Sequence, residues 1–397
     1  MPASLRIGLY NSIPDIGDDH LKSYVDYVQQ KWNALNTGIT LQIVAGKKYD
    51  PYGDLNKFLG TGAESFDLIE TDMARAKELV GKVLEIKKGT ADNEINAQRY
   101  IPATVDAVKR GNTYLGFPTL ACGNFIIEIQ QKNEHVVALD GTEYKDFIDS
   151  AEKAEDQMVY DGPCGKKVPK RKHARLLGGK IDDSAGWYLP FIYLDGVVDI
   201  LGPKCIDSQI KDVLAGNPHS ETVQRLRQFF GYFKNNCGDL DQENIEEDVV
   251  DGEDAYYFGF SEKLSVIFKK GNYHNIKATG VLSPPFGETN YVLVYTDALV
   301  LNKAKYEQGN DEYREAMFKF SKFFTSDQIR TDFVMGKDLG EGKIRYLLPP
   351  IKEFYESTEN DIYKAYYKIL KNGISAPAIS ETDRQIMENV LKPLVNI

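Results

Sequence analysis

The chain has 397 residues, which is enough for two large lobes and too long for a single small module. Its apolar content of 42% and charged content of 27% are ordinary for a globular protein with a sizeable core. Lys and Arg number 48 against 59 Asp and Glu, and the net charge of −11 repels polyanions. We therefore expect no nucleic-acid partner.

The cysteines and histidines lack the spacing of metal sites and disulfide frameworks. The four cysteines form no CxxC pair, and the five histidines form no HxH or HExxH pattern. We therefore expect no metal and no other cofactor. A disulfide between Cys164 and Cys205 stays open, and Cys237 reads as an unreactive thiol.

Apolar runs in the sequence are short. Residues 291–294 are followed by a charge well before the roughly 18 to 20 apolar residues that a membrane span needs, so we expect no membrane crossing. The first residues show no basic stretch followed by an apolar run, the pattern of a secretory signal. For the sequence as given this favours a cytoplasmic location, and we expect a monomer.

Strands and helices alternate from the start of the chain. Residues 5–10 read as a strand, and residues 18–35 as a helix with an apolar face at spacings of three and four. Residues 40–45 and 66–71 read as the next two strands. Such alternation predicts a mainly parallel sheet with helices on both faces.

In a sheet of this kind, ligands bind beyond the carboxyl ends of the strands. Here those ends are Tyr10, residues 45–48 and residues 71–73. The loops at these positions are our first site candidates.

The middle of the chain carries its own elements. Residues 220–233 predict a helix with Ser220 as its N-cap. Residues 162–180 are rich in Gly, Pro and Lys and read as an exposed, solvated loop. From residue 278 a strand-rich stretch leads into a helix at 311–324, and the tail beyond residue 329 reads as helical.

A chain that leaves one lobe, builds a second and returns gives two lobes joined by several crossings, with a cleft between them. This is the general shape of solute-binding proteins. We expect residues 1–121 plus 277–325 to form lobe 1 and residues 122–276 plus 326–397 to form lobe 2.

The segment 107–128 (AVKRGNTYLGFPTLACGNFIIE) resembles the entrance to the second lobe in extracytoplasmic binding proteins. Cys122 stands there, followed by a small residue, Asn124 and an apolar run, and this pattern is similar to thiaminase I. Further blocks in the same order look like that family: RIGLYNSIPD at 6–15, FDLIETDMARAKELV at 66–80, GFSEKL at 259–264, VYTDALVLN at 294–302 and YLLPP at 346–350.

The resemblance implies a two-lobed, type II periplasmic-binding-protein-like α/β fold, each lobe a mainly parallel sheet flanked by helices. It implies a thiamin-cleaving transferase without a cofactor, acting on thiamin and a nucleophilic base co-substrate. Carried over residue by residue, it assigns the nucleophile to Cys122, the general base to Glu262, carboxylates that hold the aminopyrimidine or its positive charge to Asp72 and Asp297, and aromatic faces and hydroxyls to Tyr10 and Tyr295.

This sequence departs from the family pattern at two places. Phe260 stands where the family has a hydroxylated aromatic before its SerGlu pair, and residues 243–251 are acidic where a family tyrosine is expected. The specificity for the entering nucleophile, or the hydrogen bonding of the base, is therefore expected to differ.

The proposed chemistry needs a soft nucleophile. Thiamin joins an aminopyrimidine to a thiazolium through one methylene, and direct displacement there has no activated electrophile. A thiolate that adds to the ring carbon next to nitrogen breaks aromaticity, so the adduct can expel the thiazole as a neutral molecule. An amine, pyridine or thiol then adds to the methylene and the cysteine is expelled.

The chemistry also needs a base. An unperturbed thiol has a pKa of ~8.5 and requires a base to form the thiolate at neutral pH. Glu262 can serve only if it lies within hydrogen-bond reach of Cys122 and out of bulk water.

Each site residue also has a structural alternative. Cys122 is a small residue suited to a core, Glu262 suits the first turn of a helix, and Asp72 and Asp297 suit N-caps. Trp187 favours core packing over stacking on a ligand.

Two alternative functions remain at this stage. A non-catalytic solute-binding protein for thiamin or a related pyrimidine would use the same cleft. A cysteine hydrolase has less support because no Cys/His pair is recognisable.

Overall fold

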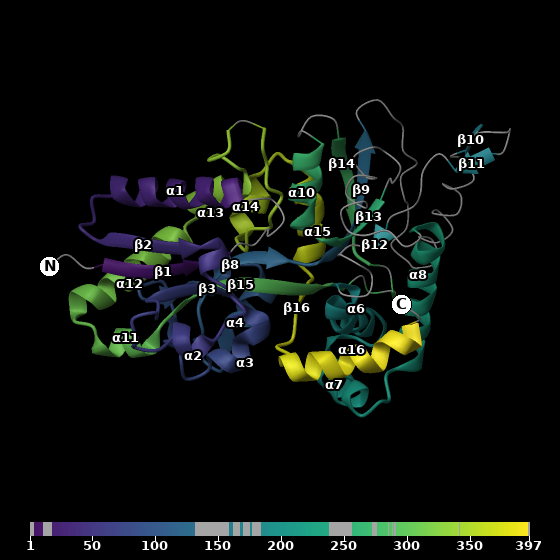
Figure 1. Ribbon diagram of the computed structural model, residues 1–397, viewed down its shortest axis with the longest axis horizontal. Helices are drawn as coiled ribbons and strands as arrows, with labels where there is room; N and C mark the ends of the chain where they lie inside the picture. Colours follow the sequence, from purple (N-terminus) through teal and green to yellow (C-terminus); the bar gives the residue numbers. More distant parts are fainter. Residues whose placement is uncertain are drawn as a thin grey trace. The chain divides into compact units, whose positions relative to one another are not determined.

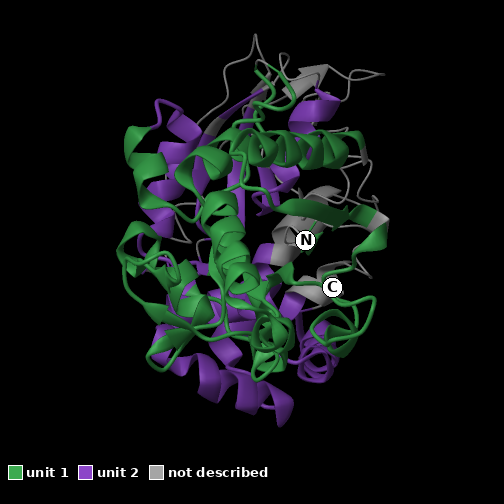
Figure 2. Cartoon of the chain, turned by 90° about the vertical axis from the view of Figure 1, so that its left-hand side faces the viewer, with its two compact units in different colours: residues 1–122, 294–357, 375–378 green, residues 123–293, 358–374, 379–397 purple. Residues whose placement is uncertain are grey.

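In the computed structural model, the chain divides into two compact units (Figure 2). Unit 1 comprises Met1–Cys122, Val294–Ser357 and Ser375–Ala378, and unit 2 comprises Gly123–Leu293, Thr358–Ile374 and Ile379–Ile397. The described residues are 4–10, 18–131, 159–161, 167–169, 175–176, 184–237, 256–271, 276–284, 286–287, 289, 291–340 and 342–395. Within them, no helix combines the length and the apolar character needed to cross a membrane.

The units and the lobes expected from the sequence both divide the chain beside Cys122. They assign three later stretches, residues 277–293, 326–357 and 375–378, to different halves.

The main sheet of unit 1 has the order β2–β1–β3–β15, with β8 paired to the other edge of β15 (Figure 1). Strands β1, β2 and β3 run parallel, while β15 runs antiparallel to both β3 and β8. The bounds are β1 (Ser4–Leu9), β2 (Thr40–Ala45), β3 (Leu68–Asp72), β8 (Phe117–Cys122) and β15 (Leu293–Leu301), with the short β16 (Ile374–Ser375) also on β15.

The early elements follow the sequence pattern closely. Helix α1 (Asp18–Ala34) buries Tyr24, Val28 and Trp32, which are four residues apart and share one face. The third strand begins two residues later than predicted, because the amide of Phe66 donates to the carbonyl of Phe58 at the end of α2 (Leu55–Phe58).

Helices and a second, small sheet complete unit 1. The small sheet has the order β5–β4–β7–β6. Its strands are β4 (Ile86–Lys88), β5 (Glu94–Ile95), β6 (Lys109–Arg110) and β7 (Thr113–Tyr114). The helices are α1, α2 (Leu55–Phe58), α3 (Ala76–Leu79), α4 (Pro102–Val108), α11 (Lys303–Gln308), α12 (Asp311–Phe324), α13 (Asp327–Val334) and α14 (Lys352–Ser357), with short 3-10 turns at Gly46–Lys48, Met73–Arg75 and Ala97–Arg99.

The main sheet of unit 2 has the order β12–β13–β9–β14. Strand β9 runs antiparallel to both β13 and β14, so these two strands run in the same direction as each other. The bounds are β9 (Asn124–Gln131), β12 (Arg175–Leu176), β13 (Tyr256–Phe260) and β14 (Ile276–Leu282); β10 (Val159–Asp161) and β11 (Lys167–Pro169) form a separate antiparallel pair.

Each main sheet thus has one long strand that opposes the direction of the others, β15 in unit 1 and β9 in unit 2. Both of these strands lie where the chain has just passed from the other unit. Most strands of each main sheet run in the same direction, as predicted from the alternation of strands and helices, but every ladder that β15 forms with β3 and β8, and β9 with β13 and β14, is antiparallel. These reversed strands are the ones that carry the chain between the units.

Helix α6 is the central helix of unit 2. Its residues from Leu189 to Val198 are buried, and it packs against α7, α8 and α16. The helices of this unit are α6 (Ser184–Ile200), α7 (Ile206–Leu214), α8 (Ser220–Cys237), α10 (Lys263–Lys270), α15 (Asp361–Leu370) and α16 (Glu381–Val395), with a 3-10 turn at Pro203–Cys205.

The start of α8 corrects one prediction. Ser220 lies inside the helix, and His219 precedes it as the capping residue. The amide of Val223 donates to the carbonyl of His219, and the amide of Thr222 donates to its Nδ1 at 3.4 Å. The histidine ring thus takes the role expected of a serine hydroxyl.

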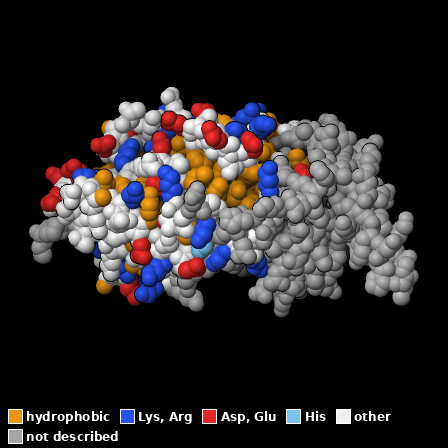
Figure 3. Space-filling view, turned by 90° about the horizontal axis from the view of Figure 1, so that it is seen from above, with side chains coloured by type: hydrophobic (Ala, Val, Ile, Leu, Met, Phe, Trp, Pro, Cys, Tyr) orange, Lys and Arg blue, Asp and Glu red, His pale blue; other side chains and the backbone are white. Residues whose placement is uncertain are grey.

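Charged side chains of both signs intermix on the face shown in Figure 3, and apolar side chains gather in one area of it. The predicted loop at 162–180 lies outside the described residues except for two short strand segments, and so does the side chain of Trp187.

Candidate functional site

The carboxyl end of β3 provides a buried carboxylate. Asp72 is 9% exposed, and its Oδ1 accepts a hydrogen bond of 2.8 Å from the amide of Ala74, so it caps the 3-10 turn that follows. Burial raises the pKa of Asp72, while the Ala74 amide and the Tyr52 hydroxyl act in the opposite direction. The N-cap alternative is therefore observed for this residue, and one carboxylate oxygen remains for other partners.

The second carboxylate oxygen of Asp72 accepts a hydrogen bond from a tyrosine that was not identified from the sequence. The hydroxyl of Tyr52 donates to Oδ2 of Asp72 at 3.1 Å, and the ring of Tyr10 meets the Tyr52 ring edge-on with centroids 6.2 Å apart. Tyr10, Tyr52 and Asp72 therefore form one cluster. Tyr52 lies in the turn after β2, and the carboxyl end of β2 was one of the candidate regions. The residues of that turn show no helix or strand periodicity, so no signal in the sequence pointed to Tyr52.

Strand β15 carries two more predicted residues and pairs one of them with a third on β8. Tyr295 pairs with Cys122 on β8, and Asp297 pairs with Asp72 on β3. Residues two apart on a strand share a face, and directly paired residues point to the same side of the sheet. Cys122, Tyr295, Asp297 and Asp72 therefore lie along one face of three neighbouring strands.

The pairing of Asp297 with Asp72 places two carboxyl groups directly opposite each other. Paired residues have Cβ atoms about 4.5 to 5.5 Å apart, and like charges at that separation repel. A cation bound between them would relieve the repulsion. Asp297 lies inside β15, so the N-cap alternative is wrong for this residue.

Cys122 ends β8, and its half-buried thiol is not part of a disulfide. The amide of Ala121 donates to the carbonyl of Leu348 at 2.7 Å, which fixes the strand just before the thiol. The next residue, Gly123, has no room for a side chain, since a Cβ there would lie 2.9 Å from the Phe125 ring and 3.2 Å from the Leu293 carbonyl. Close packing thus explains the small residue after the cysteine.

Glu262 belongs to unit 2, where it directly precedes α10 and is half-buried. Within that unit, Phe260 pairs with Asn124, and the amide of Ser261 donates to the carbonyl of Gly123 at 3.2 Å. Glu262 therefore directly follows a residue bonded to Gly123, and Cys122 directly precedes Gly123 in the chain.

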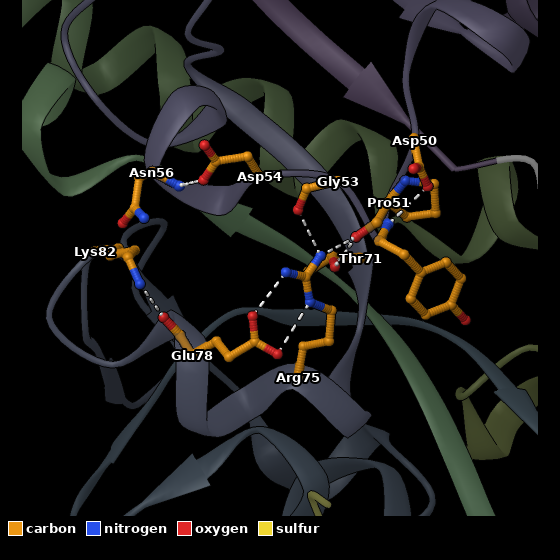
Figure 4. A network of polar contacts seen from close by, with 10 residues as sticks. Asp50, Pro51, Gly53, Asp54, Asn56, Thr71, Arg75, Glu78 and Lys82 are labelled. Atoms are coloured by element: carbon orange, nitrogen blue, oxygen red, sulfur yellow. Dashed lines mark hydrogen bonds and ion pairs between the residues drawn. The ribbon is translucent and has the colours of Figure 1, made fainter. Parts of the chain in front are cut away.

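An arginine holds the turn that carries Tyr52 (Figure 4). Nη1 of Arg75 donates to the carbonyls of Pro51 and Gly53 at 2.8 and 3.0 Å, on either side of Tyr52. Nη2 of the same guanidinium donates to Glu78 at 2.7 Å. Arg75 therefore ties the turn at 50–54 to the helical segment that follows β3.

Among the described residues, no group of three or more His, Cys, Asp or Glu side chains is arranged to hold a metal ion. Cys205 has a free thiol, whereas Cys164 lies outside the described residues and only the backbone of Cys237 is described.

No family model and no curated relative matches this sequence. Among solved structures, Clostridium botulinum thiaminase I in complex with thiamin matches with a TM-score of 0.64 and 16% identity, over 99% of this chain and 100% of that chain. Thiaminase I from Bacillus thiaminolyticus matches with a TM-score of 0.64 and 15% identity, over 99% of both chains. A cyclo/maltodextrin-binding protein complexed with maltotetraose matches with a TM-score of 0.66 and 14% identity, over 98% of this chain and 94% of that chain.

Identities this low show the fold alone, and the fold class expected from the sequence is confirmed. The chain has the α/β fold of type II solute-binding proteins over nearly its whole length, a fold that thiaminase I and maltodextrin-binding proteins share.

Proposed function

We propose that the protein is a thiaminase I-like transferase that cleaves thiamin at its methylene bridge and passes the pyrimidinylmethyl group to a nucleophilic base. The fold implies a small-molecule ligand, and the identity of that ligand is our proposal. The observation that carries it is the row formed by Cys122, Tyr295, Asp297 and Asp72 on one face of the unit 1 sheet. A soft nucleophile beside carboxylates and an aromatic ring matches the needs of a cationic, electron-poor heterocycle.

In this proposal Cys122 adds as a thiolate to the pyrimidine carbon next to nitrogen. The new C–S bond breaks the aromaticity of the ring, and the ring electrons then break the bond from the methylene to the thiazolium nitrogen. The thiazole departs neutral because its nitrogen was already cationic. A base adds to the exposed methylene, and expulsion of the Cys122 thiolate restores the aromatic ring.

Glu262 is proposed as the base that takes the thiol proton. Its support is the hydrogen bond from the Ser261 amide to the Gly123 carbonyl, because Glu262 and Cys122 are each one residue away from that bond. Glu262 is half-buried, which supports the requirement that the base be kept out of bulk water. Its hydrogen bond to the Cys122 thiol is part of the proposal.

Asp72 and Asp297 are proposed to hold the amino group of the pyrimidine and to stabilise positive charge. Carboxylates accept N–H hydrogen bonds strongly, and a paired set attracts a cation more than either alone. The edge-on pair of Tyr10 and Tyr52, together with Tyr295, offers aromatic surface and hydroxyl groups to a flat heterocycle.

A second candidate is a non-catalytic binding protein for thiamin or a related pyrimidine. It is favoured by the maltodextrin-binding protein, whose fold matches this chain with a TM-score of 0.66. Such a protein would bind through the same aromatic and acidic residues and leave the ligand intact.

One experiment separates the two candidates. The protein is incubated with thiamin and pyridine, and the mixture is analysed for free thiazole and for the pyridine-exchanged pyrimidine. We expect both products with the native protein and with Cys205→Ser, a matched loss of the other described cysteine that is not in a disulfide. We expect Cys122→Ser to bind thiamin and give neither product.

Binding without products in the native protein would favour the second candidate. Products from Cys122→Ser would rule out the proposed mechanism.

A further inference from the structure

A buried aspartate in unit 2 joins the two chain segments that flank the proposed site. Asp195 lies on α6 and is 1% exposed. Its Oδ1 accepts a hydrogen bond of 2.7 Å from the amide of Leu293, and its Oδ2 accepts one of 3.3 Å from the side-chain amide of Asn124. A buried carboxylate needs such donors, since an unpaired one is costly.

Both donors stand at passages between the units. Asn124 is two residues after Cys122, and Leu293 is two residues before Tyr295. The two segments also touch directly, because a Cβ on Gly123 would lie 3.2 Å from the Leu293 carbonyl. Asp195 therefore bonds to the chain just after the proposed nucleophile and just before the strand that carries its paired tyrosine.

A second aspartate, one helical turn later, extends this anchor. Asp199 is also 1% exposed, and it accepts hydrogen bonds from the amide of Gly287 and from the amide and hydroxyl of Thr289, the latter two at 3.1 and 2.9 Å. Through these two carboxylates α6 holds the chain at several points between residues 287 and 293. This fixes the segment that leads into β15.

The surroundings of Asp195 make its charge state sensitive to pH. Burial raises the pKa of Asp195 to about 7, and the negative charge of Asp199 on the same helix adds to the rise. The amide of Leu293 and the side chain of Asn124, from the two passages, favour the charged form. From α8, the uncharged Thr222 packs against α6 at Gly196, where a Cβ would lie 2.9 Å from its methyl group.

We propose that Asp195 is a positioning residue for Cys122: by accepting hydrogen bonds from both passages, it fixes the backbone on which the thiol and Tyr295 are held. In this role it touches neither substrate nor thiol. The proposal deepens the proposed function, yet its main test requires only the thiol and no substrate.

The test measures how fast iodoacetamide alkylates Cys122, with Cys205 on the same molecule as the internal reference. Peptide mass spectrometry gives both rates, and their ratio cancels global effects. Asp195→Asn keeps the shape of the side chain but turns an amide group toward Asn124, so one hydrogen bond is lost. We expect the ratio to fall by about fivefold or more, since a displaced thiol loses its activating partner.

A reversed pair provides the rescue. In the double variant Asp195→Asn with Asn124→Asp, the amide donates and the carboxylate accepts, so the hydrogen bond between the two side chains returns with opposite polarity. We expect the ratio to recover to within about twofold of the native value. If Asp195→Asn acted only through a general structural effect, the second substitution would not restore the ratio. In the native protein, a plot of the ratio against pH should also show a change near pH 7, where Asp195 ionises. The same plot for Asp195→Asn should lack this change.

If Asp195→Asn unfolds, Cys205 will react faster as well, and Asn124→Ala becomes the variant to compare because it removes one donor and keeps the carboxylate. A ratio that is unchanged or raised in the folded variant overturns the inference. Failure of the thiamin exchange assay with a lowered ratio would instead contradict the proposed function and leave the positioning role standing.

Discussion

Asp72 and Asp297 face each other across β3 and β15, and like charges placed directly opposite each other are destabilising. Natural sheets avoid like charges directly opposite each other, so a functional reason is expected. Binding of a cationic ring would recover the cost. At the scale of single residues, our proposal of a cationic ligand rests chiefly on this pair.

We predict that Asp297→Asn weakens thiamin binding by roughly tenfold, the effect of losing about 1.4 kcal/mol of charge attraction. An analogue with an uncharged ring in place of the thiazolium should lose much less. Glu64→Gln, at an exposed carboxylate paired with Lys57, is the control for a change in net charge. Isothermal titration calorimetry measures the affinities of the native protein and both variants for thiamin and for the uncharged analogue. If Asp297→Asn loses as much affinity for the uncharged analogue as for thiamin, the role of the pair is contradicted.

Tyr52→Phe keeps the ring and removes the hydroxyl, which donates to Asp72 and also hydrogen-bonds with Tyr10. Without that donor the charged carboxylate is less favoured, so the pKa of Asp72 should rise further. We expect about fivefold weaker binding near neutral pH and a binding curve displaced to higher pH. Tyr27→Phe, which breaks a similar bond to Asp332 elsewhere in unit 1, should leave binding unchanged.

At the scale of elements, the periodicity of apolar residues predicted the helices and strands that a short stretch of sequence specifies by itself. Helix α1 and strand β2 follow the expected bounds because their apolar residues repeat at helical and strand spacing. The pairing of β15 with β3 and β8 joins segments far apart in the sequence, and no local pattern specifies its register. The resemblance supplied Tyr295 and Asp297, but only the register puts Cys122 and Asp72 opposite them.

The turn that carries Tyr52 illustrates what the sequence left undetermined. Its position depends on the guanidinium of Arg75, which donates to carbonyls at Pro51 and Gly53 from a helical segment after the next strand. Backbone carbonyls leave no mark in the sequence, so neither the clamp nor the tyrosine could be predicted from residue type.

Arg75→Met should release this turn. We expect unfolding free energy to fall by about 1 to 3 kcal/mol, as charged hydrogen bonds are lost, and thiamin binding to weaken because Tyr52 is no longer held. The control is Lys82→Met, since Nζ of Lys82 donates to the carbonyl of Glu78 in the same network without reaching the turn. Denaturant unfolding and calorimetry provide the two measurements, and equal effects from both variants would contradict the clamp.

At the scale of the whole molecule, the chain passes repeatedly between two units, and α6 holds two of those passages through buried carboxylates. The sequence predicted two lobes and several crossings from the return of strands late in the chain. It gave no reason to single out Asp195, which stands in an apolar helix far in sequence from both partners.

Asp195 also makes stability depend on pH. Its pKa is about 7 in the fold and ~3.9 when unfolded, so between these values the folded state binds the extra proton and stability falls as pH rises. Protonation of Asp195 contributes on the order of 4 kcal/mol to the free energy of unfolding. This contribution is fully present below pH ~4 and is lost by the time the pH exceeds ~7. Urea unfolding between pH 4 and 8 measures the free energy of unfolding as a function of pH. We expect the curve of Asp195→Asn to be flatter than that of the native protein in this range, and two parallel curves would contradict the prediction.

The central claim is that the thiol of Cys122 forms a covalent bond to the pyrimidine of thiamin. The most direct measurement is mass spectrometry of the protein after incubation with thiamin and no added base, followed by peptide mapping. The account predicts free thiazole and a pyrimidinylmethyl group attached to the peptide that contains Cys122, absent in Cys122→Ser. Thiazole released by Cys122→Ser, or the group found on Cys205 instead, would contradict it.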